Sequence, residues 1–168
     1  YHYWPLFLYF SSAFSMLTGL PDNVLLKLFP IITVGMYALL AFLILRVKLA
    51  LPYAALGSAI VLASLFIRQQ YFGPQAIAYI LFLTLVLVVS LLFFGEKISG
   101  SHQRSLLVLL FLIFAVTTFM HPLTSFMELA VIFAFYLSDR FTVKKSPIRF
   151  GRLLLVGVVI WLAYNSYA

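Results

Sequence analysis

The segment from His121 to Glu128 carries the residue types best suited to chemistry. It reads His-Pro-Leu-Thr-Ser-Phe-Met-Glu and separates two apolar stretches. Proline is favoured as the first residue of a helix, because its missing N–H group would have no partner there. Positions 121, 124, 125 and 128 then share one helical face, so an imidazole, two hydroxyls and a carboxyl group can converge. Glu128 lies inside the apolar zone, where an ionisable side chain is costly and marks a candidate functional site.

A purely structural role for Glu128 is the alternative. The carboxyl group would then be neutral, or paired with Arg68 or His121, and would only hold helices together. His121 would likewise be an ordinary turn residue at the membrane interface.

A second group of candidates surrounds Arg68, in a polar stretch between two apolar segments. Arg68 is followed by Gln69 and, after Gly73-Pro74, by Gln75. A guanidinium group binds phosphate or pyrophosphate through two parallel hydrogen bonds, and glutamine amides bind hydroxyls. The alternative is that Arg68 only reaches lipid headgroups.

The opening residues His2 and Tyr3, followed by Trp4, form a third candidate. Aromatic rings beside a histidine suit a sugar ring, and they suit an interfacial aromatic belt equally well. Catalytic residues are not identified in the sequence. Cysteine is absent, and we find no phosphate-binding glycine loop and no metal-ligand spacing, so no cofactor is evident.

The elements that must position these residues are membrane-spanning helices. The chain has 168 residues, 65% hydrophobic and only 9% charged, which excludes an ordinary soluble domain. The composition predicts an all-α, polytopic bundle with lipid as its surroundings. We expect a single transmembrane domain over 1–168 with an interfacial helix at 5–19, where Ser11 and Ser15 interrupt the apolar residues and Gly19 and Pro21 follow. Six spans are expected near 24–45, 50–67, 74–94, 105–120, 122–138 and 151–167.

Basic residues predict the orientation. If the six spans alternate, loops 46–49, 95–104 and 139–150 share one side and hold most of the Lys and Arg. The positive-inside rule places that side in the cytoplasm, and the net charge of +7 requires no nucleic acid as partner. The candidate residues His2, Arg68, Gln75 and His121 then lie on the outer side.

The order of short motifs resembles the GT-C fold glycosyltransferases. The motifs are Tyr-His-Tyr-Trp-Pro-Leu-Phe at the start, Thr-Gly-Leu-Pro, Leu-Lys-Leu-Phe-Pro before a span ending in Arg-Val-Lys, Gln-Gln-Tyr-Phe-Gly-Pro-Gln at 69–75 and His-Pro-Leu-Thr at 121–124. The resemblance implies a membrane enzyme of a prokaryotic plasma membrane that uses a polyprenyl-phosphate-linked sugar as donor. Arg68 would contact the phosphate, His2, Tyr3, Gln69, Gln75 and His121 would bind substrate, and Glu128 would orient His121 or a hydroxyl.

One departure from that family concerns the catalytic aspartate or acidic pair of its first outer loop. No residue here matches it, so the resemblance implies either an internal part of a longer chain or a degenerate relative of the family. Any divalent metal would then need ligands from that missing loop. Two other classes stay open: a transporter or ion-pathway subunit that uses Glu128, and a non-catalytic subunit that assembles with another membrane chain.

Overall fold

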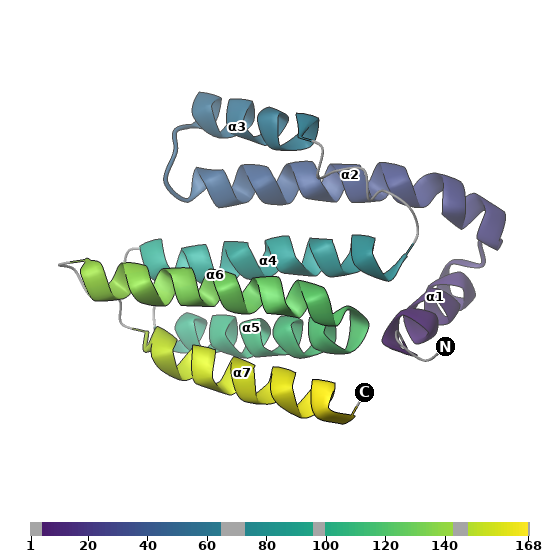
Figure 1. The fold of residues 1–168 in the computed structure, drawn as a ribbon. Helices are drawn as coiled ribbons and strands as arrows, with labels where there is room; N and C mark the ends of the chain where they lie inside the picture. The colour runs from purple at the N-terminus through teal and green to yellow at the C-terminus, as the bar shows by residue number, and fades with distance from the viewer. Residues whose placement is uncertain (1–4, 65–72, 96–99, 143–147, 168) are drawn as a thin grey trace.

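The computed structural model describes residues 5–64, 73–95, 100–142 and 148–167, all of them helices and short connections. Figure 1 shows the order of the helices along the chain. Their bounds are α1 Pro5–Thr18, α2 Asp22–Arg46, α3 Leu51–Ala63, α4 Pro74–Phe94, α5 Gly100–Met120, α6 Pro122–Phe141 and α7 Phe150–Tyr167. The prediction of an all-α protein is therefore confirmed.

Four of these helices are long and apolar enough to cross a bilayer: Asn23–Arg46, Pro74–Phe94, Gly100–Met120 and Pro122–Phe141. They match four of the six expected spans. The expected spans at 50–67 and 151–167 coincide with shorter apolar helices, Leu51–Ala63 and Phe150–Ser166. In the first of these, the helix stops because Ser64 adopts an extended conformation (φ −70°, ψ 148°), although the apolar sequence continues.

Helix α4 is the centre of the bundle. It packs against α2, α5 and α6, and Figure 1 shows it between α2 on one flank and α5 and α6 on the other. Among the described residues, α4 exposes one large apolar side chain, that of Phe94. Each of the other helices exposes several. A helix that is apolar all round belongs in a core, and the outer helices present their exposed apolar side chains to lipid.

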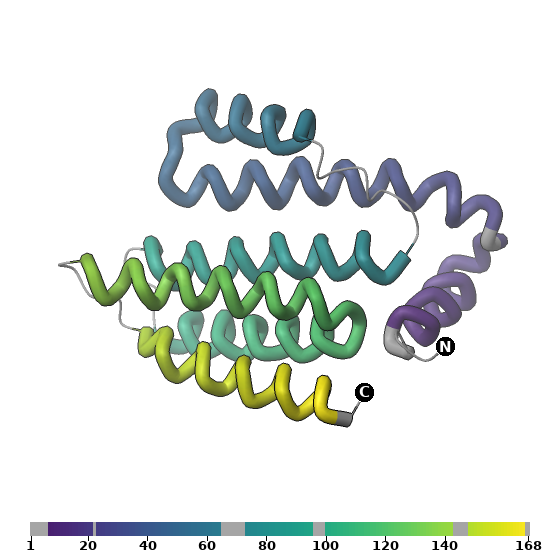
Figure 2. The backbone as a smooth tube through the Cα atoms, viewed as in Figure 1, coloured from purple at the N-terminus to yellow at the C-terminus, as the bar shows by residue number. Residues whose placement is uncertain are grey.

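The chain passes back and forth along the bundle, as the tube in Figure 2 shows. The ends of α2, α4 and α6 therefore lie at the same end of the bundle as the starts of α3, α5 and α7. We call this the basic end, because its described residues include Arg46, Lys48, Arg104, Arg140, Arg149 and Arg152. The predicted gathering of basic residues at one end is confirmed for these six.

Helix α1 lies at the opposite end, across the ends of the bundle helices (Figure 1). Its Phe7 and Phe10 pack against a small core cluster of Phe29, Ala76, Ile77 and Met120. Its other face is apolar too, with Tyr9 and Met16 exposed. Gly19 ends the helix in the left-handed region (φ 64°), and its N–H group donates to the Ser15 carbonyl oxygen at 2.9 Å. The interfacial position of α1 stays a prediction.

Helix α2 is fastened to α4 by Tyr37. Its hydroxyl donates to the Ala76 carbonyl oxygen at 3.0 Å, and the side chain is buried. Tyr37→Phe is expected to lower the free energy of unfolding by about 0.5–1.5 kcal/mol, the usual contribution of one hydrogen bond. The measurement is the apparent melting temperature in detergent. Tyr53→Phe on the exposed side of α3 is the control, and an equal loss in that variant would contradict the assignment.

Candidate functional site

The turn between α5 and α6 is built around His121. Its N–H group donates to the Thr117 carbonyl oxygen at 2.7 Å, and its carbonyl oxygen accepts from the Thr124 N–H group at 3.0 Å. Pro122 occupies the first turn of α6, as the sequence predicts. The imidazole Nδ1 lies 2.9 Å from Thr124 Oγ1, which confirms the predicted convergence of these two side chains. His121 is thereby held half-buried at the end of the bundle opposite the basic end.

Burial lowers the pKa of His121 below its ordinary value of 6.5. Between the two pKa values the unfolded chain binds more protons than the folded chain. The contribution of His121 to stability is therefore complete above about pH 6.5 and is lost as the pH falls through that value toward the folded pKa.

We expect the apparent melting temperature to fall between pH 7.5 and pH 5 and His121→Gln to reduce that dependence. The control is His102→Gln, a change in an exposed histidine of α5. An unchanged pH dependence in His121→Gln would contradict the prediction.

Glu128 lies about two helical turns further along α6 and is completely buried. Neither carboxyl oxygen has a hydrogen-bond partner among the described residues. Thr117 of α5 faces the carboxyl group, but the hydroxyl of Thr117 already donates its hydrogen to the Ile113 carbonyl oxygen at 2.9 Å. Glu128 is thus a carboxyl group without a donor, in a place where an uncompensated charge is costly.

The hydroxyl groups beside Glu128 share one property. Thr117 and Ser125 are both fully buried, and each hydroxyl donates its hydrogen bond to a backbone carbonyl oxygen of its own helix. Ser125 lies three residues before Glu128 and so on the same face of α6. Toward Glu128 these hydroxyls can therefore only accept hydrogen bonds, through the lone pairs of their oxygen atoms. The surroundings of Glu128 therefore suit a proton, a hydroxyl hydrogen or a small cation, and they do not suit a phosphate.

Helix α7 closes this region from the other side. The indole N–H of Trp161 donates to the Pro122 carbonyl oxygen at 3.2 Å, an oxygen that also accepts from Ser125 Oγ at 2.7 Å. The Trp161 ring also contacts the ring of Phe126, with centroids 5.8 Å apart. Trp161 was not among the candidates from the sequence, because its role depends on which helix packs beside Pro122.

Gln75 comes from the first turn of α4 and is half-buried. Its neighbours in the chain, Ala76 and Ile77, form a core cluster with Met120, the residue before His121. Gln75 and His121 therefore lie at the same end of the bundle, the end against which α1 packs. The structure thus places Gln75 and His121 at one end of the bundle and Glu128 about two turns further along α6. His2, Tyr3, Arg68 and Gln69 lie outside the described residues.

A metal centre finds no support in the ranges that the structure describes. No group of three or more His, Cys, Asp or Glu side chains there could hold a metal ion. No known protein family matches the chain, and no curated protein or solved structure matches it either. What the sequence and structure establish is a helical protein with four candidate membrane spans.

Proposed function

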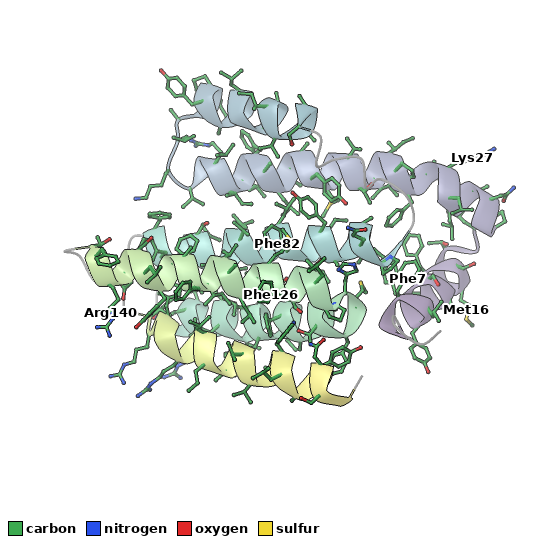
Figure 3. The ribbon with its side chains drawn as sticks, viewed as in Figure 1. Phe7, Met16, Lys27, Phe82, Phe126 and Arg140 are labelled. Atoms are coloured by element: carbon green, nitrogen blue, oxygen red, sulfur yellow. The ribbon has the colours of Figure 1, made fainter. Side chains whose placement is uncertain are left out.

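We propose that the chain is part of the transmembrane domain of an enzyme that transfers a sugar from a polyprenyl-phosphate donor to an acceptor at the extracytoplasmic face. The observation that supports the proposal is that Gln75 and His121 lie at the end of the bundle opposite the basic end, with Glu128 buried about two turns further along α6. In Figure 3, the label of Arg140 marks the basic end and the label of Lys27 marks the opposite end. The basic end faces the cytoplasm in this proposal.

Each side chain has a role that suits its position. Gln75 and His121, both half-buried at the helix ends, hydrogen-bond hydroxyls of the sugar or the acceptor. Arg68 binds the lipid phosphate, as the resemblance implies. Gln69 binds substrate, and His2 and Tyr3 contact the sugar ring. Glu128 accepts a hydrogen bond from a hydroxyl that enters the site.

The test uses the full-length protein in liposomes that contain a radiolabelled polyprenyl-phosphate sugar. Gln75→Ala and His121→Ala are each expected to reduce transfer by about three- to tenfold, the effect of losing one hydrogen bond to substrate. Arg68→Ala should weaken donor binding by about tenfold or more, because its hydrogen bonds to phosphate are charge-assisted. His102→Ala, at the basic end, is the matched control. Transfer that none of the first three changes reduces would refute the proposal.

A second candidate rests on Glu128 alone. A completely buried carboxyl group without a donor, in a helix that begins at a proline, is also suited to binding a proton or a monovalent cation on its way across a membrane. In proteoliposomes with a trapped pH-sensitive dye, the wild type would then carry protons or couple them to an ion gradient, and Glu128→Gln would abolish the flux. Sugar transfer without any such flux would exclude this candidate.

A further inference from the structure

A pocket of about 460 Å³ lies at the basic end, between the last turns of α6 and the start of α7. Its volume is within the range of roughly 300–1,000 Å³ that small-molecule sites occupy. The lining residues are Tyr136, Asp139, Arg140, Arg149, Phe150, Gly151 and Arg152. The pocket is at the opposite end of the helices from His121, and the proposed function does not use it.

Three guanidinium groups and one carboxyl group give the pocket a net positive charge. Arg149 immediately precedes α7 and Arg152 lies in its first turn, where the Arg152 N–H group donates to the Arg149 carbonyl oxygen at 2.9 Å. Both side chains line the pocket. Arg140 lines the pocket from α6, so guanidinium groups come from both helices, and each can bind a phosphate group through two parallel hydrogen bonds.

The walls of the pocket are built from packed side chains. Arg140 Nε donates to the Tyr136 hydroxyl at 3.3 Å, and its guanidinium lies 5.7 Å from the centroid of the Tyr136 ring. On α7, a Cβ atom added to Gly151 would lie 3.2 Å from Tyr136 Cε2, so the absence of a side chain at Gly151 allows the ring to lie close to the helix. Below, the buried Phe150 packs against Phe135 and Phe93.

The neighbourhood of the pocket indicates what kind of phosphate it accepts. Exposed apolar side chains occur on the same helical turns: Leu137 and Phe141 near the end of α6, and Leu155 one turn after Arg152 on α7. Helix α6 is itself a candidate membrane span. A free phosphate ion would not bury these apolar side chains, whereas the acyl chains of a lipid would remove them from water. We propose that this pocket binds the phosphate group of an anionic phospholipid, with the acyl chains along α6 and α7.

The experiment measures lipid retained by the purified full-length chain in a zwitterionic detergent, using native mass spectrometry with added phosphatidylglycerol or phosphatidylcholine. The variant changes Arg140, Arg149 and Arg152 to glutamine. The control changes Arg46, Lys48 and Arg104 to glutamine, which removes the same charge from the basic end outside the pocket. We expect preferential retention of phosphatidylglycerol by the wild type and the control, and a loss of about tenfold or more in the pocket variant.

Three results would overturn the proposal. Equal losses in the two triple variants would show a general attraction to the basic end without a site. Equal retention of phosphatidylglycerol and phosphatidylcholine would show that the negative charge is not recognised. Displacement of the lipid by millimolar inorganic phosphate, with phosphate itself retained, would assign the pocket to the free ion. The melting temperature of each variant is measured alongside, and Arg149→Gln with Arg152→Gln alone repeats the comparison if the triple variant does not fold.

Discussion

Replacing Glu128 with leucine is expected to stabilise the chain by about 1–3 kcal/mol, the usual cost of a buried polar group that lacks a partner. Both carboxyl oxygens are without a donor among the described residues, and leucine has a similar volume. The same variant is expected to lose the activity that uses Glu128, be it sugar transfer or ion flux. The measurement pairs the apparent melting temperature in detergent with the activity in liposomes.

Glu128→Gln is the matched variant, because it keeps the size of the side chain and removes the ability to bind a proton. Its amide can donate to the lone pairs of Thr117, so we expect a change in stability below about 1 kcal/mol. Activity is expected to fall as far as in Glu128→Leu. If Glu128→Leu instead destabilised the chain, the carboxyl group would be a structural one with a partner, and the functional assignment would fail.

Gly157→Leu is expected to separate α6 from α7. A Cβ atom at Gly157 would lie 2.8 Å from Leu129 Cδ2 and 3.6 Å from Phe114 Cζ, so even alanine requires Leu129 to move. The larger side chain has no room and should cost about 1–3 kcal/mol or more, as overpacked cores do. The measurement is the apparent melting temperature. Gly35→Leu is the control, since nothing lies within 4 Å of a Cβ atom there.

A compensating change tests the same contact more directly. Leu129→Ala alone removes a buried side chain and is expected to destabilise the chain. Combined with Gly157→Leu, it provides the missing space, so the double variant should be more stable than the sum of the two single effects predicts. Strict additivity would show that the two residues do not meet.

Much of the fold could be predicted because it depends on local rules. The composition requires helices in lipid, and Pro74 and Pro122 begin helices because proline costs nothing in a first turn. Helix α5 begins at Gly100, earlier than the expected start at 105, because backbone hydrogen bonds continue through polar residues such as Ser101. The pattern of apolar residues indicates which part of a helix faces lipid, but it does not indicate where the backbone hydrogen bonds of the helix begin.

The site was predictable only in part, for a related reason. The His121–Thr124 contact follows from helical spacing, and its position was expected. The missing partner of Glu128 depends on which face of α5 lies opposite, and spacing within α6 carries no information on that. The pocket of Arg140, Arg149 and Arg152 likewise joins two helices across a connection. The structure therefore adds the contacts between helices, which the sequence of one segment does not encode.

Helix α3 has a consequence for the bilayer itself. Its 13 residues are apolar, pack on α2 and expose Leu51, Leu56 and Ile60 outward. At 1.5 Å per residue the helix is about 20 Å long, against a hydrocarbon thickness of about 30 Å. Where a helix of this length crosses a bilayer, the mismatch is relieved when the neighbouring leaflets draw closer together. The α3 flank is therefore expected to thin the bilayer locally, so that the headgroup of a long-chain amphiphile reaches deeper beside α3 than elsewhere around the bundle.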